Sequence, residues 1–226
     1  MGRFSGHNLT LTLYLAVSLF IALDLREYAR AYTAARLHDP TPRLWGRLTF
    51  SPKAWFEPFG SGLLPGLILV LWSVLTFFPP VVAYGKPAPV DPNYFRRYKR
   101  DSVVVGLAGP GINVAFAVVA GLIVRAAGAS EFARFASAFM FVNLCMAIFH
   151  LLPIPGLDGA RLVALVLPPR AAETYRNLDA YLPLFVLVVI FLLAGPVQSI
   201  TFGLTNAVCE GVSGNSCVAG MQIVIN

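Results

Sequence analysis

Charged residues are scarce in this sequence: they make up 12% of its 226 residues, whereas hydrophobic residues make up 57%. A soluble domain carries about a quarter charged residues, so the composition argues against a soluble globular chain and indicates a membrane protein. The net charge is +6, but no basic module with interleaved aromatic residues accompanies it. We therefore expect the lipid bilayer as a partner, and no nucleic acid.

Cysteines are also few, and their spacing fits no zinc finger. Cys145 lies in an apolar run and is expected in the core. Cys209 and Cys217 stand eight positions apart in the C-terminal tail. This spacing allows either a disulfide, if the tail lies in an oxidising compartment, or two free thiols.

Long apolar runs are what the sequence has in abundance. They occupy residues 8–25, 62–84, 103–127, 135–153 and 181–198, and a membrane span needs about 20 residues. We predict an all-α, polytopic membrane domain over 1–198, followed by a small C-terminal tail over 199–226. The patterns of 43–50 and 81–90, the second rich in proline, predict two short edge strands.

Arg26-Glu27-Tyr28-Ala29-Arg30, at the end of the first apolar run, has the spacing of a zinc-protease motif. In H-E-x-x-H the two histidines lie one helical turn apart and bind the metal, and the glutamate acts as general base. Arg26 and Arg30 replace both histidines here, and an arginine cannot lose its proton to bind a metal. Snorkelling of these arginines to the membrane interface is the alternative interpretation.

Further motifs follow in order along the chain. They are Gly-Arg-Leu-Thr at 46–49, Lys-Pro-Ala-Pro-Val at 86–90, Ala-Gly-Pro-Gly-Ile-Asn at 108–113 and Leu-Pro-Ile-Pro-Gly-Leu-Asp-Gly at 152–159. With Glu27-Tyr28-Ala29, they make the chain resemble the site-2 protease family of intramembrane zinc metalloproteases, in its compact bacterial branch. The resemblance covers about residues 8–198 and implies a location in the bacterial plasma membrane, with several spans.

The resemblance also assigns roles to single residues. It makes Glu27 the general-base position, and Arg26, Arg30 and Asp158 degenerate zinc-ligand positions. Gly109, Asn113 and His150 fall at substrate- or partner-binding positions.

Simpler roles stay open for several of these residues. Asn113 could equally be a satisfied core asparagine, and His150 a buried, hydrogen-bonded histidine. Residues 108–110 could simply begin a helix that packs closely. Trp55 stands where a histidine is common in the family. We therefore expect no zinc in this chain, whether it is a natural inactive enzyme or an engineered variant.

The distribution of Lys and Arg bears on topology. Residues 26–53 hold six of the seventeen, 86–100 hold five and 161–176 hold three. If residues 62–84 form a re-entrant or laterally packed segment, these basic stretches all lie on one face, as the positive-inside tendency requires. Glu27, Asn113 and Asp158 then reach the cytoplasmic face together, and both termini lie outside.

Three functions fit this sequence. The first is a pseudoprotease that binds or stabilises a single-span membrane protein, since the family cuts such segments in regulated intramembrane proteolysis. The second is an active metalloprotease with a non-standard site of Glu27, His150 and Asp158. The third is a transporter or channel subunit that uses its buried charges as an ion path. We further predict that the arginines take the place of the metal and pair with Asp158, because Arg26, Arg30, Glu27 and Asp158 sum to zero charge.

Overall fold

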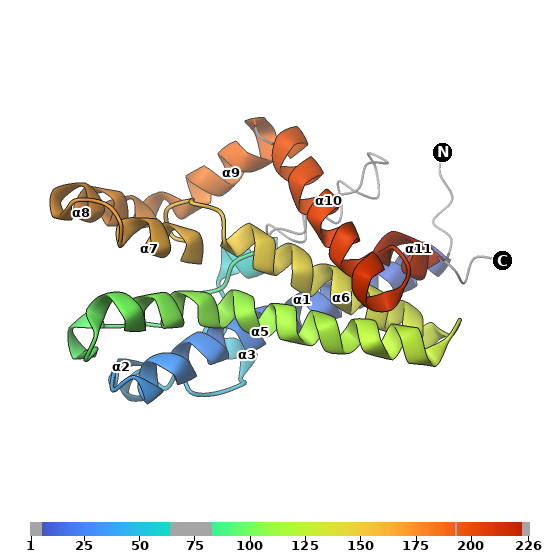
Figure 1. Ribbon diagram of the computed structural model, residues 1–226, viewed down its shortest axis with the longest axis horizontal. Coiled ribbons are helices and arrows are strands. Elements are labelled where there is room, and N and C mark those ends of the chain that lie inside the picture. The colour runs from blue at the N-terminus through green and yellow to red at the C-terminus, as the bar shows by residue number, and fades with distance from the viewer. Residues whose placement is uncertain (1–5, 64–82, 193, 223–226) are drawn as a thin grey trace.

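The computed structural model describes residues 6–63, 83–192 and 194–222. Three long helices run side by side through the molecule (Figure 1): α1 (Gly6–Arg36), α5 (Tyr98–Ala127) and α6 (Glu131–His150). Ser130 caps α6, because its side chain accepts a hydrogen bond from the backbone N–H of Ala133 at 3.1 Å. Among the described residues, α5 and α6 are long and apolar enough to cross a membrane.

Shorter helices surround these three. Between α1 and α5 lie α2 (Thr41–Leu44), α3 (Pro52–Trp55), η1 (Pro58–Leu63) and η2 (Pro92–Tyr94). After α6 come α7 (Asp158–Ala164), α8 (Pro169–Asn177), η3 (Leu178–Tyr181), α9 (Leu182–Leu192), α10 (Ala194–Ser213) and α11 (Cys217–Gln222).

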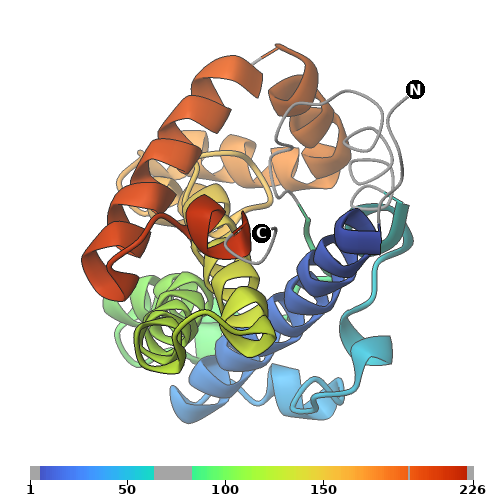
Figure 2. The same ribbon diagram turned by 90° about the vertical axis from the view of Figure 1, so that its right-hand side faces the viewer.

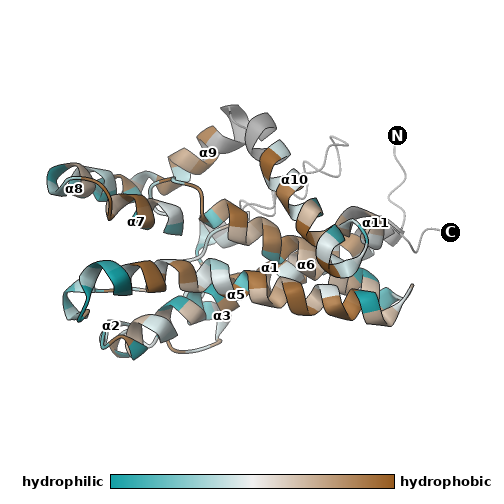
Figure 3. Cartoon of the chain, viewed as in Figure 1, coloured by the Kyte–Doolittle hydropathy of each residue, from teal (hydrophilic) through white to brown (hydrophobic). Residues whose placement is uncertain are grey.

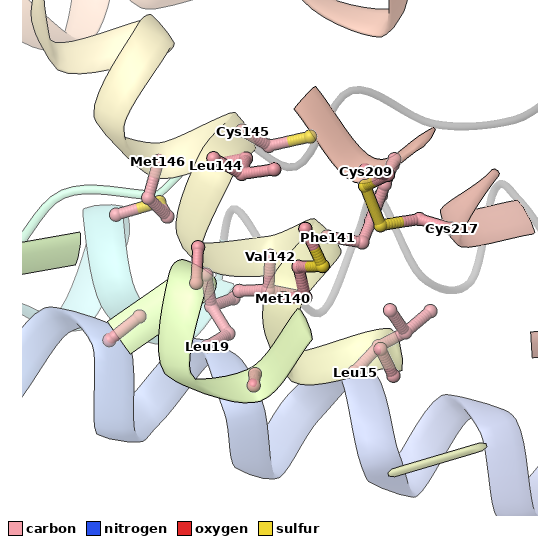
Figure 4. Packing of buried hydrophobic residues seen from close by; sticks show 14 of the residues in the cluster. Leu15, Leu19, Met140, Phe141, Val142, Leu144, Cys145, Met146, Cys209 and Cys217 are labelled. Atoms are coloured by element: carbon pink, nitrogen blue, oxygen red, sulfur yellow. A yellow bond between two sulfur atoms is a disulfide. The ribbon is translucent and has the colours of Figure 1, made fainter. Parts of the chain in front are cut away.

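Helix α6 lies at the centre, with α1, α5, α10 and α11 around it (Figure 2). It carries apolar side chains on almost every face, so it suits the interior of the bundle. Figure 4 shows Met140 and Phe141 of α6 within a cluster that also holds Leu15 and Leu19 of α1. Figure 3 shows the same division by hydropathy: the middle parts of α5 and α6 are hydrophobic, and the start of α5 and much of α8 are hydrophilic.

The two predicted edge strands are wrong for the described residues. Residues 43–50 form the end of α2 and a turn, and residues 83–90 belong to no helix or strand. Among the described residues, one backbone hydrogen bond joins this second segment to α3, from Lys86 N–H to the carbonyl of Trp55 at 2.8 Å. Pro87 and Pro89 have no N–H to donate, so a longer ladder cannot form there.

The predicted tail is helical. Residues 199–222 belong to α10 and α11, and these helices pack against α5 and α6. Cys209 and Cys217 form a disulfide, which confirms the pairing over the free thiols, and Cys145 is buried in the core as expected. The division of the chain into a domain of 1–198 and a tail of 199–226 stays a prediction.

The path of the chain bears on the re-entrant segment. Helix α1 ends, and α5 begins, at the same end of the bundle (Figure 1). Most of the segment, residues 64–82, lies outside the described residues, so its path stays a prediction. Pro110 lies inside α5 rather than at a helix start.

Candidate functional site: a buried arginine–carboxylate cluster

The end of α1 meets the start of α7, and four charged side chains come together there. Nη2 of Arg26 donates to Oδ2 of Asp158 at 2.7 Å. Nε of Arg30 lies 3.4 Å from Oδ1 of Asp158, an ion pair without a hydrogen bond. The two arginines reach the same carboxylate because they lie four positions apart, on one face of a helix. The predicted pairing of the arginines with Asp158 is therefore confirmed.

Glu27 belongs to the same cluster, and both of its carboxylate oxygens are occupied. Nη1 of Arg26 donates to Oε1, and Nη1 of Arg30 lies 3.1 Å from Oε2. The backbone N–H of Ala88 donates to Oε2 at 3.0 Å. Both oxygens of Glu27 are therefore engaged by donors of the chain itself: two guanidinium groups and a backbone amide.

Burial makes these charges strongly dependent on one another. The side chains of Arg26, Arg30, Glu27 and Asp158 are each at most 3% exposed, which argues against snorkelling to the interface. Burial alone would raise the pKa of Asp158, but the guanidinium groups of Arg26 and Arg30 outweigh it and lower the pKa to about 2. The carboxylate is therefore charged at neutral pH.

Gly109 of α5 allows the helices to approach this closely. A Cβ atom at this position would lie 2.8 Å from Cγ of Arg26 and 3.3 Å from Oδ2 of Asp158. Real Cβ atoms essentially never show a contact under 3.0 Å. The structure therefore gives Gly109 a packing role beside the cluster, and its expected part in binding a partner stays a prediction.

Asn113 and His150 are fully buried polar residues close in sequence to the motifs. Both amide atoms of Asn113, Nδ2 and Oδ1, lack a hydrogen-bond partner among the described residues. Nδ1 of His150 lies 2.9 Å from the carbonyl oxygen of Met146, which fits the simpler interpretation of a buried, hydrogen-bonded histidine. Its Nε2 has no partner in the described part of the chain. In the described part of the chain, neither residue forms a hydrogen bond with Arg26, Glu27, Arg30 or Asp158.

Two further contributors were missed by the sequence interpretation. The first is the N–H of Ala88; it lies between Pro87 and Pro89, so it is the only amide that this Pro-Ala-Pro stretch can offer to Glu27. The second is Arg161, which follows Asp158 by three positions on α7. It lies close enough to Arg30 for the charge of that guanidinium to lower the pKa of Arg161. The spacing of three was a usable signal, since such residues share a helix face.

Trp55 stands beside the cluster in a structural role. Its indole N–H donates to the carbonyl of Thr49 at 2.9 Å, and the guanidinium of Arg47 lies 5.3 Å from the centre of its ring. It is 2% exposed. The residue therefore fixes the loop that carries α3 rather than offering a ligand.

The residues at this site do not fit a zinc ion. Zinc binds thiolates, neutral imidazoles and carboxylates, but here two guanidinium groups point at the two carboxylates. Within the described residues, no group of three or more His, Cys, Asp and Glu side chains is placed to hold a metal. The alternative set of Glu27, His150 and Asp158 therefore gains no support from the structure.

Comparison with known proteins identifies relatives over most of the chain. The chain is 30% identical over 193 residues to "Putative zinc metalloprotease YwhC" of Bacillus subtilis, an alignment that covers 80% of this chain and 81% of YwhC. The chain belongs to the site-2 protease family. "Putative zinc metalloprotease Rip2" of Mycolicibacterium smegmatis is 33% identical over 179 residues, which are 78% of this chain and 64% of Rip2.

No protein-family model matches the chain. No solved structure matches it either. The assignment to the site-2 protease family therefore rests on sequence relatives together with the order of the motifs. Among the described residues, two helices are long and apolar enough to cross a membrane, which fits a membrane location.

Proposed function

We propose that this chain is a pseudoprotease: a site-2 protease homologue that does not use zinc or cut peptide bonds, and that binds a transmembrane segment of a partner protein. One observation carries this proposal, namely the ion pairs of Arg26 and Arg30 with Glu27 and Asp158. The guanidinium groups take up the carboxylates that a zinc site would use for a ligand and for a base.

Zinc-dependent hydrolysis needs an open metal position, a bound water and a base that can take its proton. The two guanidinium groups of the cluster supply positive charge, but they do so as fixed hydrogen-bond donors and not as a Lewis acid. Neither guanidinium can lower the pKa of a coordinated water, because neither coordinates one. These residues therefore support a site in which charged side chains hold one another in place and no water is activated for attack on a peptide bond.

Unsatisfied polar atoms near the motifs support a binding role. Buried polar groups are nearly always hydrogen-bonded in proteins, so each exception calls for an explanation. Both amide atoms of Asn113 and Nε2 of His150 are such exceptions among the described residues. A transmembrane segment whose helix is locally opened would offer backbone N–H and C=O groups to these atoms.

The decisive test restores the missing histidines. In the double variant Arg26→His/Arg30→His, Asp158 and Glu27 are freed from the guanidinium groups, and the chain regains the ligand set of its family. We expect the purified variant to bind about one zinc per chain, and the wild-type protein to bind none by metal analysis. Arg26→Gln/Arg30→Gln is the matched control, because it removes the same charges without adding ligands.

Proteolysis is measured on the same three proteins with a single-span substrate in detergent or vesicles. The wild-type protein and the glutamine control should leave the substrate intact. Zinc near one equivalent in the wild-type protein, lost on Asp158→Ala, would overturn the proposal, as would cleavage by the wild-type protein.

Partner binding needs its own test. The wild-type protein and an Asn113→Leu variant are purified from the membranes of the native host, and co-purifying single-span proteins are identified by mass spectrometry. Leucine has the same number and branching of side-chain heavy atoms as asparagine but removes both unpartnered polar atoms. We expect a single-span protein to be recovered with the wild-type protein and to be depleted with the variant. Equal recovery would argue against a role for Asn113.

A further inference from the structure

A second polar site lies beside the arginine–carboxylate cluster, at the end of the bundle where α5 begins. It is a cavity of about 280 Å³ between the start of α5, helix α7 and η3. The side chains that matter below are Tyr98, Ser102, Arg161, Arg176 and Asp179, all of which line it. In Figure 1, α7 and α8 face the first turns of α5 at this end of the bundle.

Arg161 lines the cavity without a protein partner. Its guanidinium forms no ion pair or hydrogen bond with any residue that the structure describes, and its Nε is closed off from solvent. The nearby guanidinium of Arg30, together with burial, lowers the pKa of Arg161 to about 10. The side chain remains charged at neutral pH.

The cavity wall carries more positive than negative charge. Arg161 and Arg176 line it together with one carboxylate, that of Asp179, whose Oδ1 also accepts a hydrogen bond from the N–H of Gly156 at 2.7 Å. The inner cluster beside it holds two arginines and two carboxylates and is neutral in itself. An unpaired, partly buried charge is costly to maintain, so an anion in the cavity would stabilise this region.

Other donors of the cavity wall suit a phosphate oxygen. Oγ of Ser102 is buried and has no hydrogen-bond partner among the described residues. Nη1 of Arg176 donates to the hydroxyl of Tyr98 at 3.1 Å and Nε donates to the carbonyl of Ala172 at 3.2 Å, which leaves Nη2 of this exposed guanidinium available. Two guanidinium groups and a hydroxyl form the kind of donor set that binds phosphate, because an arginine fork matches its oxygens.

We propose that this cavity binds the phosphate of an anionic phospholipid headgroup. A lipid is favoured over soluble phosphate because apolar residues, among them Phe95, Val105 and Leu165, share the wall with the arginines. The cavity also opens where the apolar helix α5 begins, next to the basic run 96–100. Basic pockets and runs at the membrane surface attract anionic lipids. This proposal is independent of the pseudoprotease proposal and stands if the chain proves to be active.

The test uses the full-length protein in detergent, with phosphatidylglycerol or phosphatidylcholine added, and follows lipid binding by native mass spectrometry and by thermal unfolding. We expect phosphatidylglycerol to bind and to raise the unfolding temperature, and phosphatidylcholine to do neither. Arg161→Gln should weaken phosphatidylglycerol binding about tenfold or more, as expected for the loss of a charge-assisted hydrogen bond. Arg170→Gln is the matched control, because Arg170 is exposed on α8 and does not line the cavity.

Unfolding of the lipid-free protein distinguishes a structural role of Arg161 from a role in lipid binding. Because Arg161 forms no ion pair or hydrogen bond with the residues that the structure describes, Arg161→Gln should unfold no earlier than the wild-type protein without lipid. A milder variant, Ser102→Ala, should weaken binding several-fold and leave lipid-free unfolding unchanged. The proposal fails if both lipids bind equally, or if Arg170→Gln weakens binding as much as Arg161→Gln. It also fails if inorganic phosphate alone reproduces the whole effect.

Discussion

The two ends of the helical bundle are held by cross-links of different kinds. At one end, ion pairs join α1 to α7 across 132 positions of sequence, and every participant is buried. At the other end, the disulfide joins α10 to α11 across eight positions. Figure 4 shows that the disulfide lies beside apolar side chains of α6. The ion pairs, in contrast, bring four charged side chains together.

This difference predicts how strongly a substitution at each end changes the stability of the protein. A disulfide stabilises mainly by restricting the unfolded chain, so its contribution depends little on its neighbours. A buried ion pair gains little over apolar residues of the same size, yet it becomes strongly destabilising once one partner is removed. The arginine cluster is therefore expected to be the more sensitive end to the loss of a single side chain.

The largest contrast between the two ends should be the side of the membrane from which an impermeant reagent can reach them, because such labelling either occurs or does not. We predict that Ser51→Cys and Lys99→Cys, near the cluster, react with an impermeant maleimide only after cells are permeabilised. Ala129→Cys, near the disulfide end, should react in intact cells. All three positions are exposed. The background needs only Cys145→Ala, because the other two cysteines are paired.

Denatured samples of each variant control for expression and total reactivity. Reaction of Ser51→Cys and Lys99→Cys from opposite faces would reject the re-entrant topology. Reaction of all three positions from one face would show that the two ends do not lie on opposite sides of the membrane.

The largest stability effect should come from breaking the cluster on one side. Asp158→Ala leaves two buried guanidinium groups without this partner, and we expect a loss of about 3–5 kcal/mol in the free energy of unfolding. Adding Arg30→Ala should then cost less than it does in the wild-type background, with a coupling of about 0.5–3 kcal/mol. Thermal and denaturant unfolding in detergent measure both quantities. Strictly additive losses would mean that Arg30 and Asp158 do not act together.

A smaller effect is expected at the opposite end. Replacing both Cys209 and Cys217 by alanine should lower stability by about 2–3 kcal/mol, because a loop of this size restricts the unfolded chain only modestly. Unfolding of the wild-type protein with and without a reductant gives an independent measurement. Identical unfolding of reduced and oxidised protein would show that the bond contributes nothing to stability.

The sequence predicted the cluster better than the loops around it. Arg26, Arg30 and Asp158 could be placed together because a helix fixes the spacing of the first two and because the charges must balance in an apolar setting. The contact between Ala88 and Glu27 could not be predicted, since it depends on where an irregular, proline-bounded segment runs. The same prolines explain why the expected strand at 81–90 is absent from its described part.

In the C-terminal region the composition failed to predict the helices that form there. Gly, Ser and Asn gave residues 199–226 the composition of a mobile tail, but α10 continues to Ser213 and buries Cys209 against α6. A short apolar face and one disulfide are enough for docking, and neither stands out in composition. Arg161 was overlooked because a lone arginine near a helix start is usually a solvated charge, and only the fold places it beside Arg30.

The smallest predicted effects come from two glycines of α5 that differ only in their neighbours. A Cβ at Gly109 would meet Cγ of Arg26 at 2.8 Å, whereas a Cβ at Gly111 would meet nothing within 4 Å. Alanine is the better helix former by about 0.5–1 kcal/mol, so Gly111→Ala should raise stability by about that amount. Gly109→Ala should lower it by about 1–3 kcal/mol, as overpacking does. Thermal unfolding of the pair in one detergent decides the question. If Gly109→Ala is as stable as Gly111→Ala, Arg26 can move away at no cost, and the cluster is not the tightly packed cross-link described above.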